Sequence, residues 1–518
     1  KGRGEVWVAK GTYTPQTYVG GSSNTKSPLA FRMYEGVDVY GGFAGGEKLL
    51  SEREMANTDN AHMVRPWRFL NQTVFAANEF DRANTKWDEI NKVWSVSSAS
   101  YHVVWFAPLP GNPDFVVNTR LNGVTIEGGT STALTDPDEA YEPKKGTGVY
   151  MGANAILQNC IVRYCYNKGN GAGVYASKGA EVASSLIYNN VSEENGGGIY
   201  VEDDALIMRT MVANNMANNG GGIYMHHNPT SASNPYDMEV VASVVSNNTN
   251  RVNGAVYTDG GGVITQCTIT NNYTVSASDI ADQKSARTGG LYVDAYALVV
   301  NSVLWNNNLK QAATSTAATT SSYAQVYAVN ASADNVRFYN CGIISSNYVV
   351  WNNIFQKSTY NLSIDLAKDY FVDPTGKTNF ANLDSLVTQN GLQSTWTDID
   401  YFWRTRDALA FHAKGLPVGL QPAHVVTKAD LDIIGQAFDT TPAIGAYVSK
   451  ATSIVPVIIN RNDQKVLRVY VDPTASIVDG DGSTWKNNHS QFGEVLSFFG
   501  NLTDGQTIIC LVEGTESY

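Results

Sequence analysis

Several side chains that could exchange protons or bind sugar hydroxyl groups occupy matching places in the sequence. Each of them stands two residues after a tyrosine, and the set is Glu202, His226, Asp259 and Asp294. Ser177 holds the same place after Tyr175. Carboxylates and imidazoles can act as general acids and bases, or can bond the hydroxyl groups of a ligand. The elements that place them on one face must therefore repeat along the chain.

The preceding tyrosines belong to a repeated phrase of glycine, apolar residue and tyrosine. Its tyrosines recur first every 24 or 25 residues and then every 33 to 35, and they are Tyr150, Tyr175, Tyr200, Tyr224, Tyr257, Tyr292 and Tyr327. Most units also contain a β-rich run closed by paired asparagines, such as Asn189–Asn190 and Asn214–Asn215. A period in this range predicts a solenoid.

Alternating apolar and polar residues decide which solenoid is expected. Residues 199–202, Ile-Tyr-Val-Glu, have strand spacing, and no segment between the phrases has the period of a crossover helix. The sequence therefore predicts an all-β, right-handed parallel β-helix. Its inward aliphatic column would be Val149, Val174, Ile199, Ile223, Val256, Leu291 and Val326. A second inward column of small residues would be Cys160, Ser185, Thr210, Ser243, Cys267, Ser302 and Cys341.

The same register places the candidate acids in an outward row. Asp259 and Asp294 would lie one coil apart, at about 5 Å, near the separation of a retaining glycosidase pair. Glu202 and Asp259 would be about 10 Å apart, beyond the inverting range. Lyase chemistry would need acidic Ca²⁺ ligands and a base, for which Arg209 and Lys178 are the nearest candidates. Solvated strand faces are polar in any case, and no diagnostic motif accompanies the row.

We therefore assign no catalytic residue, and Glu202, Asp259, Asp294 and His226 remain candidates only. We also predict no metal site and no cofactor, with Ca²⁺ as the alternative. Mutual stacking is the favoured use of the tyrosines, whereas open ring faces would form a glycan platform. The predicted ligand-binding residues of that platform are Tyr175, Tyr200, Tyr224, Tyr257, Glu202, His226, Asp259 and Asp294.

Composition narrows the possible partners. The chain has 518 residues and a formal net charge of −12, which argues against nucleic acid as a partner. It has no apolar run of the ~18–20 residues that span a bilayer. Of its five cysteines, Cys160, Cys267 and Cys341 fall in the inward small column, so we predict buried free thiols.

Changes in pattern suggest domain limits. Residues 1–449 are predicted to form the β-helix domain, with regular coils over 146–353 and an irregular region over 354–449 that covers the open end. Strands are expected at 5–13, 37–43, 101–107 and 121–127, whereas 48–99 would leave the coil. Residues 228–236, 275–287 and 311–322 are predicted to be inserted loops, and residues 450–467 a linker.

The phrases VWVAKGTY, GVDVYGGFAGGE, LNGVTIEGG, the repeated GGGIY and AIGAYV resemble the right-handed parallel β-helix proteins of the bacterial cell surface. The glycine–apolar–tyrosine units also resemble repeats of polymorphic outer-membrane proteins and autotransported adhesins. The resemblance covers about residues 4–449 and implies a pectin-lyase-like fold and an extracellular or cell-surface location. It does not imply one chemistry, since that fold hosts lyases, hydrolases, adhesins and surface-layer proteins.

The family's opening, a strand, a GDGSSW-like turn and a capping helix, does not precede residue 1. Similar residues occur instead at 468–485, followed by a predicted helix at 492–499 and a strand at 506–515 that parallels 5–12. Residues 468–518 are therefore predicted to be the cap-like start of a second β-helix unit. The alternative is an extra layer on the first unit. Tandem units or neighbouring copies are the expected partners of this segment.

The sequence favours a secreted or cell-surface β-helix that is not a catalyst. The expected roles are adhesion, surface-layer structure or glycan binding, with polysaccharide or other cell-surface components as partners. The alternative is a polysaccharide lyase or glycoside hydrolase. Acids and a base that converge within about 6 Å in an outward groove would favour this alternative.

Overall fold

The structure is a computed structural model of the 518-residue chain. The residues that it describes are 3–19, 29–56, 66–85, 87–88, 93–106, 118–132, 142, 144–228, 234–274, 288–305, 307–309, 325–329, 335–343, 362–363, 417–427, 429–433, 437–440, 442, 444–446, 457–461, 464–471 and 507–512.

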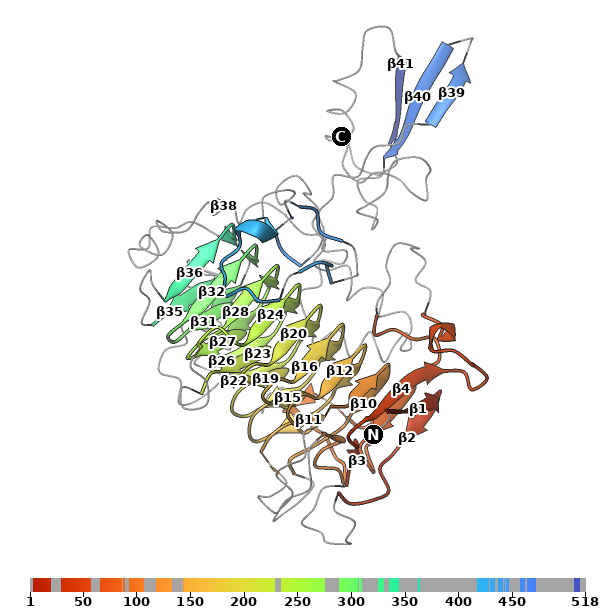
Figure 1. Ribbon diagram of the computed structural model, residues 1–518, viewed down its shortest axis with the longest axis vertical. Coiled ribbons are helices and arrows are strands. Elements are labelled where there is room, and N and C mark those ends of the chain that lie inside the picture. The colour runs from red at the N-terminus through yellow and green to blue at the C-terminus, as the bar shows by residue number, and fades with distance from the viewer. Residues whose placement is uncertain are drawn as a thin grey trace. The chain divides into compact units, whose positions relative to one another are not determined.

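Stacked short strands form a parallel β-helix over most of the described chain (Figure 1). Each full coil contributes one strand in turn to sheet one, sheet two, sheet three and the tyrosine sheet. Every pairing within these four sheets is parallel, as the repeat predicts. Parallel pairing begins at the first strand, well before the predicted start of the regular coils at residue 146.

Sheet one consists of β1 (Gly4–Ala9), β4 (Val37–Phe43), β9 (Arg120–Asn122), β12 (Ile156–Gln158), β16 (Glu181–Ala183), β20 (Leu206–Met208), β24 (Glu239–Val241), β28 (Val263–Thr265), β32 (Ala297–Val300) and β36 (Val336–Tyr339). Sheet two consists of β2 (Gly11–Tyr13), β5 (Thr73–Ala76), β10 (Val124–Glu127), β13 (Ile161–Arg163), β17 (Leu186–Tyr188), β21 (Met211–Ala213), β25 (Val244–Ser246), β29 (Thr268–Thr270), β33 (Val303–Trp305), β37 (Gly342–Ile343) and β38 (Leu362–Ser363).

Sheet three consists of β14 (Tyr166–Asn167), β18 (Val191–Ser192), β22 (Met216–Asn219), β26 (Thr249–Asn253), β30 (Tyr273–Thr274) and β34 (Asn308–Leu309). The tyrosine sheet consists of β3 (Phe31–Arg32), β8 (Val104–Phe106), β11 (Val149–Met151), β15 (Val174–Ala176), β19 (Ile199–Glu202), β23 (Ile223–His226), β27 (Val256–Asp259), β31 (Leu291–Val293) and β35 (Val326–Ala328). The remaining short elements of this part are the β6 (Trp87–Asp88) and β7 (Val93–Trp94) hairpin and the 3₁₀ turns η1 (Leu50–Glu52) and η4 (Val418–Leu420).

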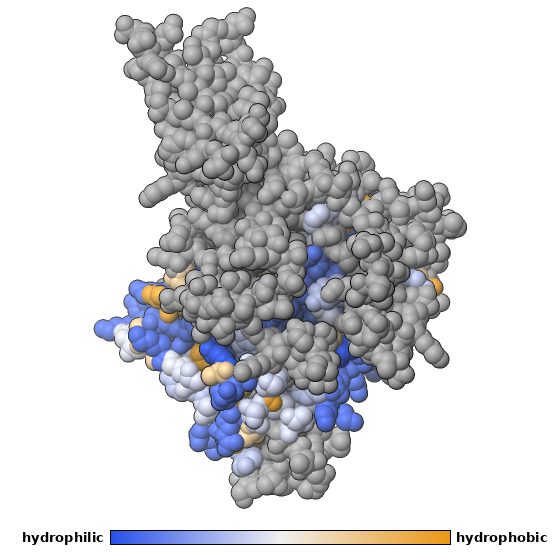
Figure 2. Space-filling view, turned by 180° about the vertical axis from the view of Figure 1, so that it is seen from behind, coloured by the Kyte–Doolittle hydropathy of each residue, from blue (hydrophilic) through white to orange (hydrophobic). Residues whose placement is uncertain are grey.

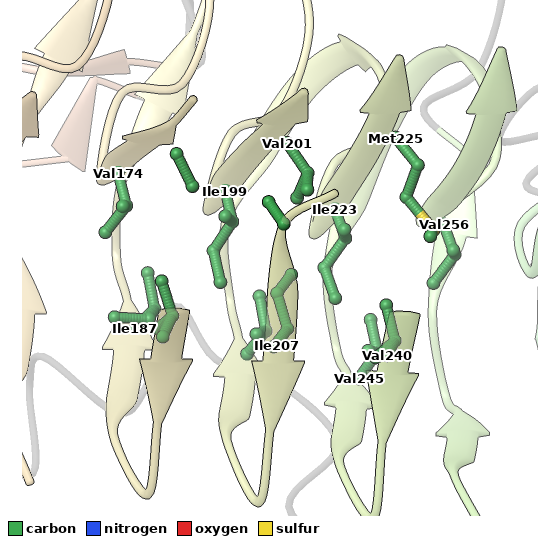
Figure 3. Close-up of a cluster of buried hydrophobic side chains, with 14 of the residues drawn as sticks. Val174, Ile187, Ile199, Val201, Ile207, Ile223, Met225, Val240, Val245 and Val256 are labelled. Carbon is green, nitrogen blue, oxygen red and sulfur yellow. The ribbon is translucent and has the colours of Figure 1, made fainter. Parts of the chain in front are cut away.

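The predicted inward columns are confirmed. All seven members of the aliphatic column are at most 1% exposed, and the strand register pairs each with the next. Figure 3 shows Val174, Ile199, Ile223 and Val256 of this column. All seven members of the small column are fully buried. Four cysteines are free and buried, including the predicted Cys160, Cys267 and Cys341 and also Cys165. Since one buried valine, leucine or isoleucine contributes about 1.5–3 kcal/mol, the continuous core is the main stabilising feature.

The two asparagines of a pair have different structural roles. In the described pairs the first asparagine takes the left-handed conformation that asparagine tolerates, as at Asn189 with φ 57° and Asn214 with φ 53°. The second is buried and passes its amide to the next coil. This amide ladder runs from Asn190 through Asn215, Asn248, Asn272 and Asn307 to Gln325, with N···O distances of 2.8–3.1 Å.

Two sequence expectations need correction. The segment 48–99 does not lie wholly outside the coil, because β5 lies between β2 and β10 in sheet two. Part of the region predicted to cover the open end lies against the sides of the sheets instead. Backbone amides of Val426 and Thr427 donate to buried Glu239 of β24, and Val425 packs beside Val263 of β28. The Ala446 N–H also donates to the Thr268 hydroxyl of β29 at 3.0 Å, so described residues of 417–446 lie along the outward faces of sheets one and two.

A second unit, residues 368–412 and 449–518, is described only at three strands. β39 (Val457–Arg461) pairs antiparallel with β40 (Gln464–Val471), which pairs parallel with β41 (Thr507–Val512). The predicted strands near 468 and 506–515 are thus present, whereas part of the predicted 450–467 linker forms a hairpin. The predicted helix at 492–499 and the inserted loops at 275–287 and 311–322 lie outside the described residues.

Candidate functional site

The candidate polar row lies at the ends of neighbouring strands in the tyrosine sheet. Glu202 pairs with His226, and His226 pairs with Asp259. Asp294 continues the row, because its backbone N–H donates to the Thr258 carbonyl at 3.0 Å. Ser177 lies one coil before Glu202, and all five members are half-buried. The predicted register of the row is therefore confirmed.

Beside this row the tyrosines form a continuous stack of rings. The column contains Trp105, Tyr150, Tyr175, Tyr200, Tyr224, Tyr257, Tyr292 and Tyr327. Successive ring centroids are 4.5–5.7 Å apart with interplanar angles of 8–21°. Tyr175 is 1% exposed, Tyr200 6% and Tyr224 8%. Val19 and Ala30 pack against the same cluster.

The expectation that neighbouring tyrosines offer open ring faces is therefore wrong for Tyr175, Tyr200 and Tyr224. Each of these rings has another ring on both faces, because the phrase places one aromatic side chain per coil in register. The favoured alternative, stacking from coil to coil, is what the structure shows. Each such pair contributes about 0.5–1.5 kcal/mol beyond the area that it buries.

Two carboxylates of the row are hydrogen-bonded to this stack. The Tyr175 hydroxyl donates to Glu202, and the Tyr224 hydroxyl donates to Asp259 at 3.0 Å. Burial, together with the charge of the neighbouring carboxylate, raises the pKa of both tyrosines, so both hydroxyls stay protonated donors at neutral pH. The two acids thus fix the hydroxyl ends of Tyr175 and Tyr224.

Asp259 also binds His226, with 2.7 Å between Oδ2 and Nδ1. The hydrogen bond raises the pKa of His226 despite the opposing effect of burial, and the same bond lowers the pKa of Asp259. Burial, followed by the charge of Asp259, raises the pKa of Asp294. Asp259 is therefore biased toward the ionised form, and Asp294 on the next coil is biased toward the protonated form.

The two basic residues considered for lyase chemistry are placed differently. Lys178 lies 3.3 Å from Asp204, in an exposed ion pair beside the row. Arg209 lies in the turn between β20 and β21, a different turn from the one that follows the row. The structure does not bring Arg209 to the outward acids.

A second polar cluster lies in the turn from the tyrosine sheet to sheet one. Asp203 follows β19, His227 follows β23, and Asp237 precedes β24. His227 Nδ1 is 3.4 Å from Asp203 Oδ1 and 3.7 Å from Asp237 Oδ1, and all three side chains are only 7% exposed. Among the described residues, this is the one His, Cys, Asp and Glu group whose ligand atoms converge, within 4.8 Å of one another.

Asp203 and His227 directly follow members of the candidate polar row in the sequence, whereas no sequence pattern singled out Asp237. The reason is physical, since Asp237 follows the insertion predicted at 228–236, and sequence spacing does not show where an inserted loop returns. Asp204, the next residue after Asp203, pairs with Lys178 instead. An acid immediately after the insertion and directly before the mainly apolar run at 238–241 was the available signal in the sequence.

Comparison with family models, with curated proteins and with solved structures found no match to this chain. Its function must therefore be inferred from two features. One is the candidate polar row, called the outward row below, and the other is the cluster of Asp203, His227 and Asp237, called the turn cluster.

Proposed function

We propose that this chain is a secreted or cell-surface β-helix that contacts polysaccharide or another surface component without cleaving it. The observation that carries the proposal is the bonding of the outward acids. Glu202 and Asp259 are held by tyrosine hydroxyls, and Asp259 also by His226. Groups fixed in this way form a rigid, regularly spaced set of acceptors and donors, which suits recognition of a repeating hydroxylated polymer.

Surface character supports the same proposal. On the face in Figure 2 the described residues are mainly hydrophilic, and apolar residues form small separate groups. The net charge of −12 disfavours nucleic acid. Within the described residues, no helix has the length and apolarity needed to cross a bilayer. A polar ligand at the half-buried row is consistent with each of these features.

The alternative is a glycoside hydrolase that uses Asp259 and Asp294. Their pKa values favour it, because that of Asp259 is lowered and that of Asp294 is raised. Environments that push two neighbouring pKa values apart are typical of a catalytic acid and base. Against it, Asp259 Oδ2 is already bonded to both Tyr224 and His226. A nucleophilic Asp259 would therefore have to attack through its other oxygen, Oδ1.

One experiment separates the two functions. The full chain is incubated on a polysaccharide array, and release of reducing or unsaturated ends is measured in parallel. We expect binding without release, and Glu202→Gln with Asp294→Asn should weaken binding roughly tenfold through weakened charged hydrogen bonds. Glu194→Gln, an exposed acid in the turn before β19, is the matched control. Ends released by the wild type but not by Asp294→Asn would establish the hydrolase instead, and no binding to any polysaccharide would reject glycan contact.

A further inference from the structure

The turn cluster has unusual spacing for a histidine between two acids. One residue earlier, His226 reaches Asp259 at 2.7 Å, the normal distance of a charge-assisted hydrogen bond. His227 Nδ1 instead lies 3.4 and 3.7 Å from its two carboxylate oxygens. Within the described part of the chain, neither His227 Nδ1 nor Asp237 Oδ1 makes a hydrogen bond, although both atoms are buried. Two adjacent histidines thus meet carboxylates in two different ways.

Leaving these atoms without partners would be costly. A buried polar group that lacks a hydrogen bond costs about 1–3 kcal/mol, and a charged group costs more. Two acids buried side by side add their mutual repulsion. A cation between them would offset both effects.

The distances match a shared metal ion. Two atoms that each lie ~2.1 Å from a tetrahedral ion are separated by about 3.4 Å, close to the 3.4 and 3.7 Å from His227 Nδ1 to the two carboxylate oxygens. An imidazole nitrogen with two carboxylate oxygens suits Zn²⁺ and related transition ions, whereas Ca²⁺ and Mg²⁺ are bound by oxygens. We propose that Asp203, His227 and Asp237 bind one divalent transition-metal ion, with Zn²⁺ as the representative species.

Neighbouring groups already orient the ligands. The backbone N–H of Asn228 donates to Asp203 Oδ1 at 2.8 Å, and the backbone N–H of His227 donates to the Asp259 carbonyl at 2.8 Å. Gly260, at φ 86°, lies close to the histidine, where an added Cβ would come within 3.3 Å of His227 Cβ. Such outer contacts hold metal ligands in place.

The ion would join successive coils. Asp203 belongs to the coil of β19, and His227 belongs to the next coil, where Asp237 marks the return of the insertion to sheet one. Three protein ligands leave one position for water. The site is independent of the proposed glycan contact, since none of its ligands belongs to the outward row.

Zinc binding to the full chain tests the proposal. The chain, with any affinity tag removed, is stripped with a chelator, dialysed and titrated with Zn²⁺ by calorimetry, and bound zinc is measured by mass spectrometry. We expect one zinc per chain and a higher melting temperature with zinc. His227→Gln and Asp237→Asn should each weaken binding by about 100-fold or more. Asp204→Asn, the adjacent acid that pairs with Lys178, is the matched control and should bind normally.

Cobalt substitution gives a second measurement. Co²⁺ in the wild type should produce visible ligand-field bands that His227→Gln removes. If one variant does not fold, the other variant and the wild-type cobalt spectrum decide. Stoichiometry well below one, zinc binding that both folded variants retain, or a cobalt spectrum of the free aqueous ion would overturn the proposal.

Discussion

At the scale of single residues, the second asparagine of each pair is the most demanding position. Asn215 donates from Nδ2 to the Ile187 carbonyl at 2.9 Å and to Asn248 Oδ1 at 3.1 Å. Its own oxygen accepts from the Asn190 backbone and side chain, both at 3.0 Å. Every hydrogen-bonding direction of this buried amide is therefore used, so no other side chain can replace it without loss.

Replacing Asn215 with Asp keeps the shape but removes both donors. We expect a loss of about 2–4 kcal/mol in unfolding free energy, because two buried acceptors lose their partners and a charge is buried. Denaturant unfolding at neutral pH measures it. The control is Asn218→Asp, three residues later in β22. Asn218 is half-buried and lies outside the ladder, so this change should alter stability by less than about 0.5 kcal/mol. Equal losses for the two variants would contradict the role of the ladder.

Residue types predicted the inward columns because burial leaves a direct mark on the sequence. Isoleucine at 199 and 223 allows one register only, since a shift by one residue would bury Glu202. The bonding of Glu202 to Tyr175 left no such mark, because a polar outward residue satisfies the pattern whether it faces water, a ligand or a phenol. Sequence therefore located the candidate row but not its partners.

At the scale of elements, sheet two carries a buried ionic cluster on its outward face. Glu127 of β10 receives hydrogen bonds from Arg163 of β13, at 2.9 Å, and from Arg82. Arg163 also donates to the Tyr188 hydroxyl of β17 at 2.8 Å. Side chains from three adjacent strands thus share one set of charges, and Glu127 and Arg163 are each 2% exposed.

This cluster should make stability depend on pH in the acid range. Burial alone would raise the pKa of Glu127, but the Arg163 and Arg82 guanidinium groups outweigh it, so the folded pKa is lowered. Its stabilisation is then complete above the unfolded glutamate pKa of about 4.3 and is lost as pH falls through the folded value.

Thermal unfolding between pH 7 and pH 2 measures this dependence. The double variant Glu127→Gln with Arg163→Met removes the ion pair without leaving one charge buried alone. We expect its melting temperature to fall less steeply below about pH 4.3 than that of the wild type. Parallel curves for the two proteins would show that the cluster does not contribute to the acid sensitivity.

At the scale of the β-helix unit, one core runs unbroken from Met33 to Ile343. Each coil contacts mainly its neighbours, so stability is a sum of coils and the interfaces between them. Sequence could not foresee that the described residues of 417–446 would return along the outside of sheets one and two. That path depends on a few apolar contacts, such as Ala429 against Val241 and Ala242, which no repeat announces.

Ile199→Asp should show how far a local defect spreads. An unpaired buried charge should cost about 4 kcal/mol or more and open the coils on both sides of β19. Hydrogen exchange should accelerate first in β15, β19 and β23 and least in β1 and β4. Ile156→Asp makes the same change at a half-buried outward position and serves as the control. Uniform exchange across all coils would contradict stepwise loss.

The amide ladder also governs how such a molecule can change length during evolution. Its last member, Gln325, uses a longer side chain to accept from Asn307 and to return its own Nε2 to the Asn307 carbonyl at 3.0 Å. Within the described residues, this turned-back amide is the last member of the series. Duplication of residues 171–195 would add one aliphatic residue, one ring and one amide to their columns, and would lengthen the axis by about 4.8 Å. Insertions of any other length inside the strands would break all the columns at once, so growth should proceed in whole coils, with extra residues confined to the turns.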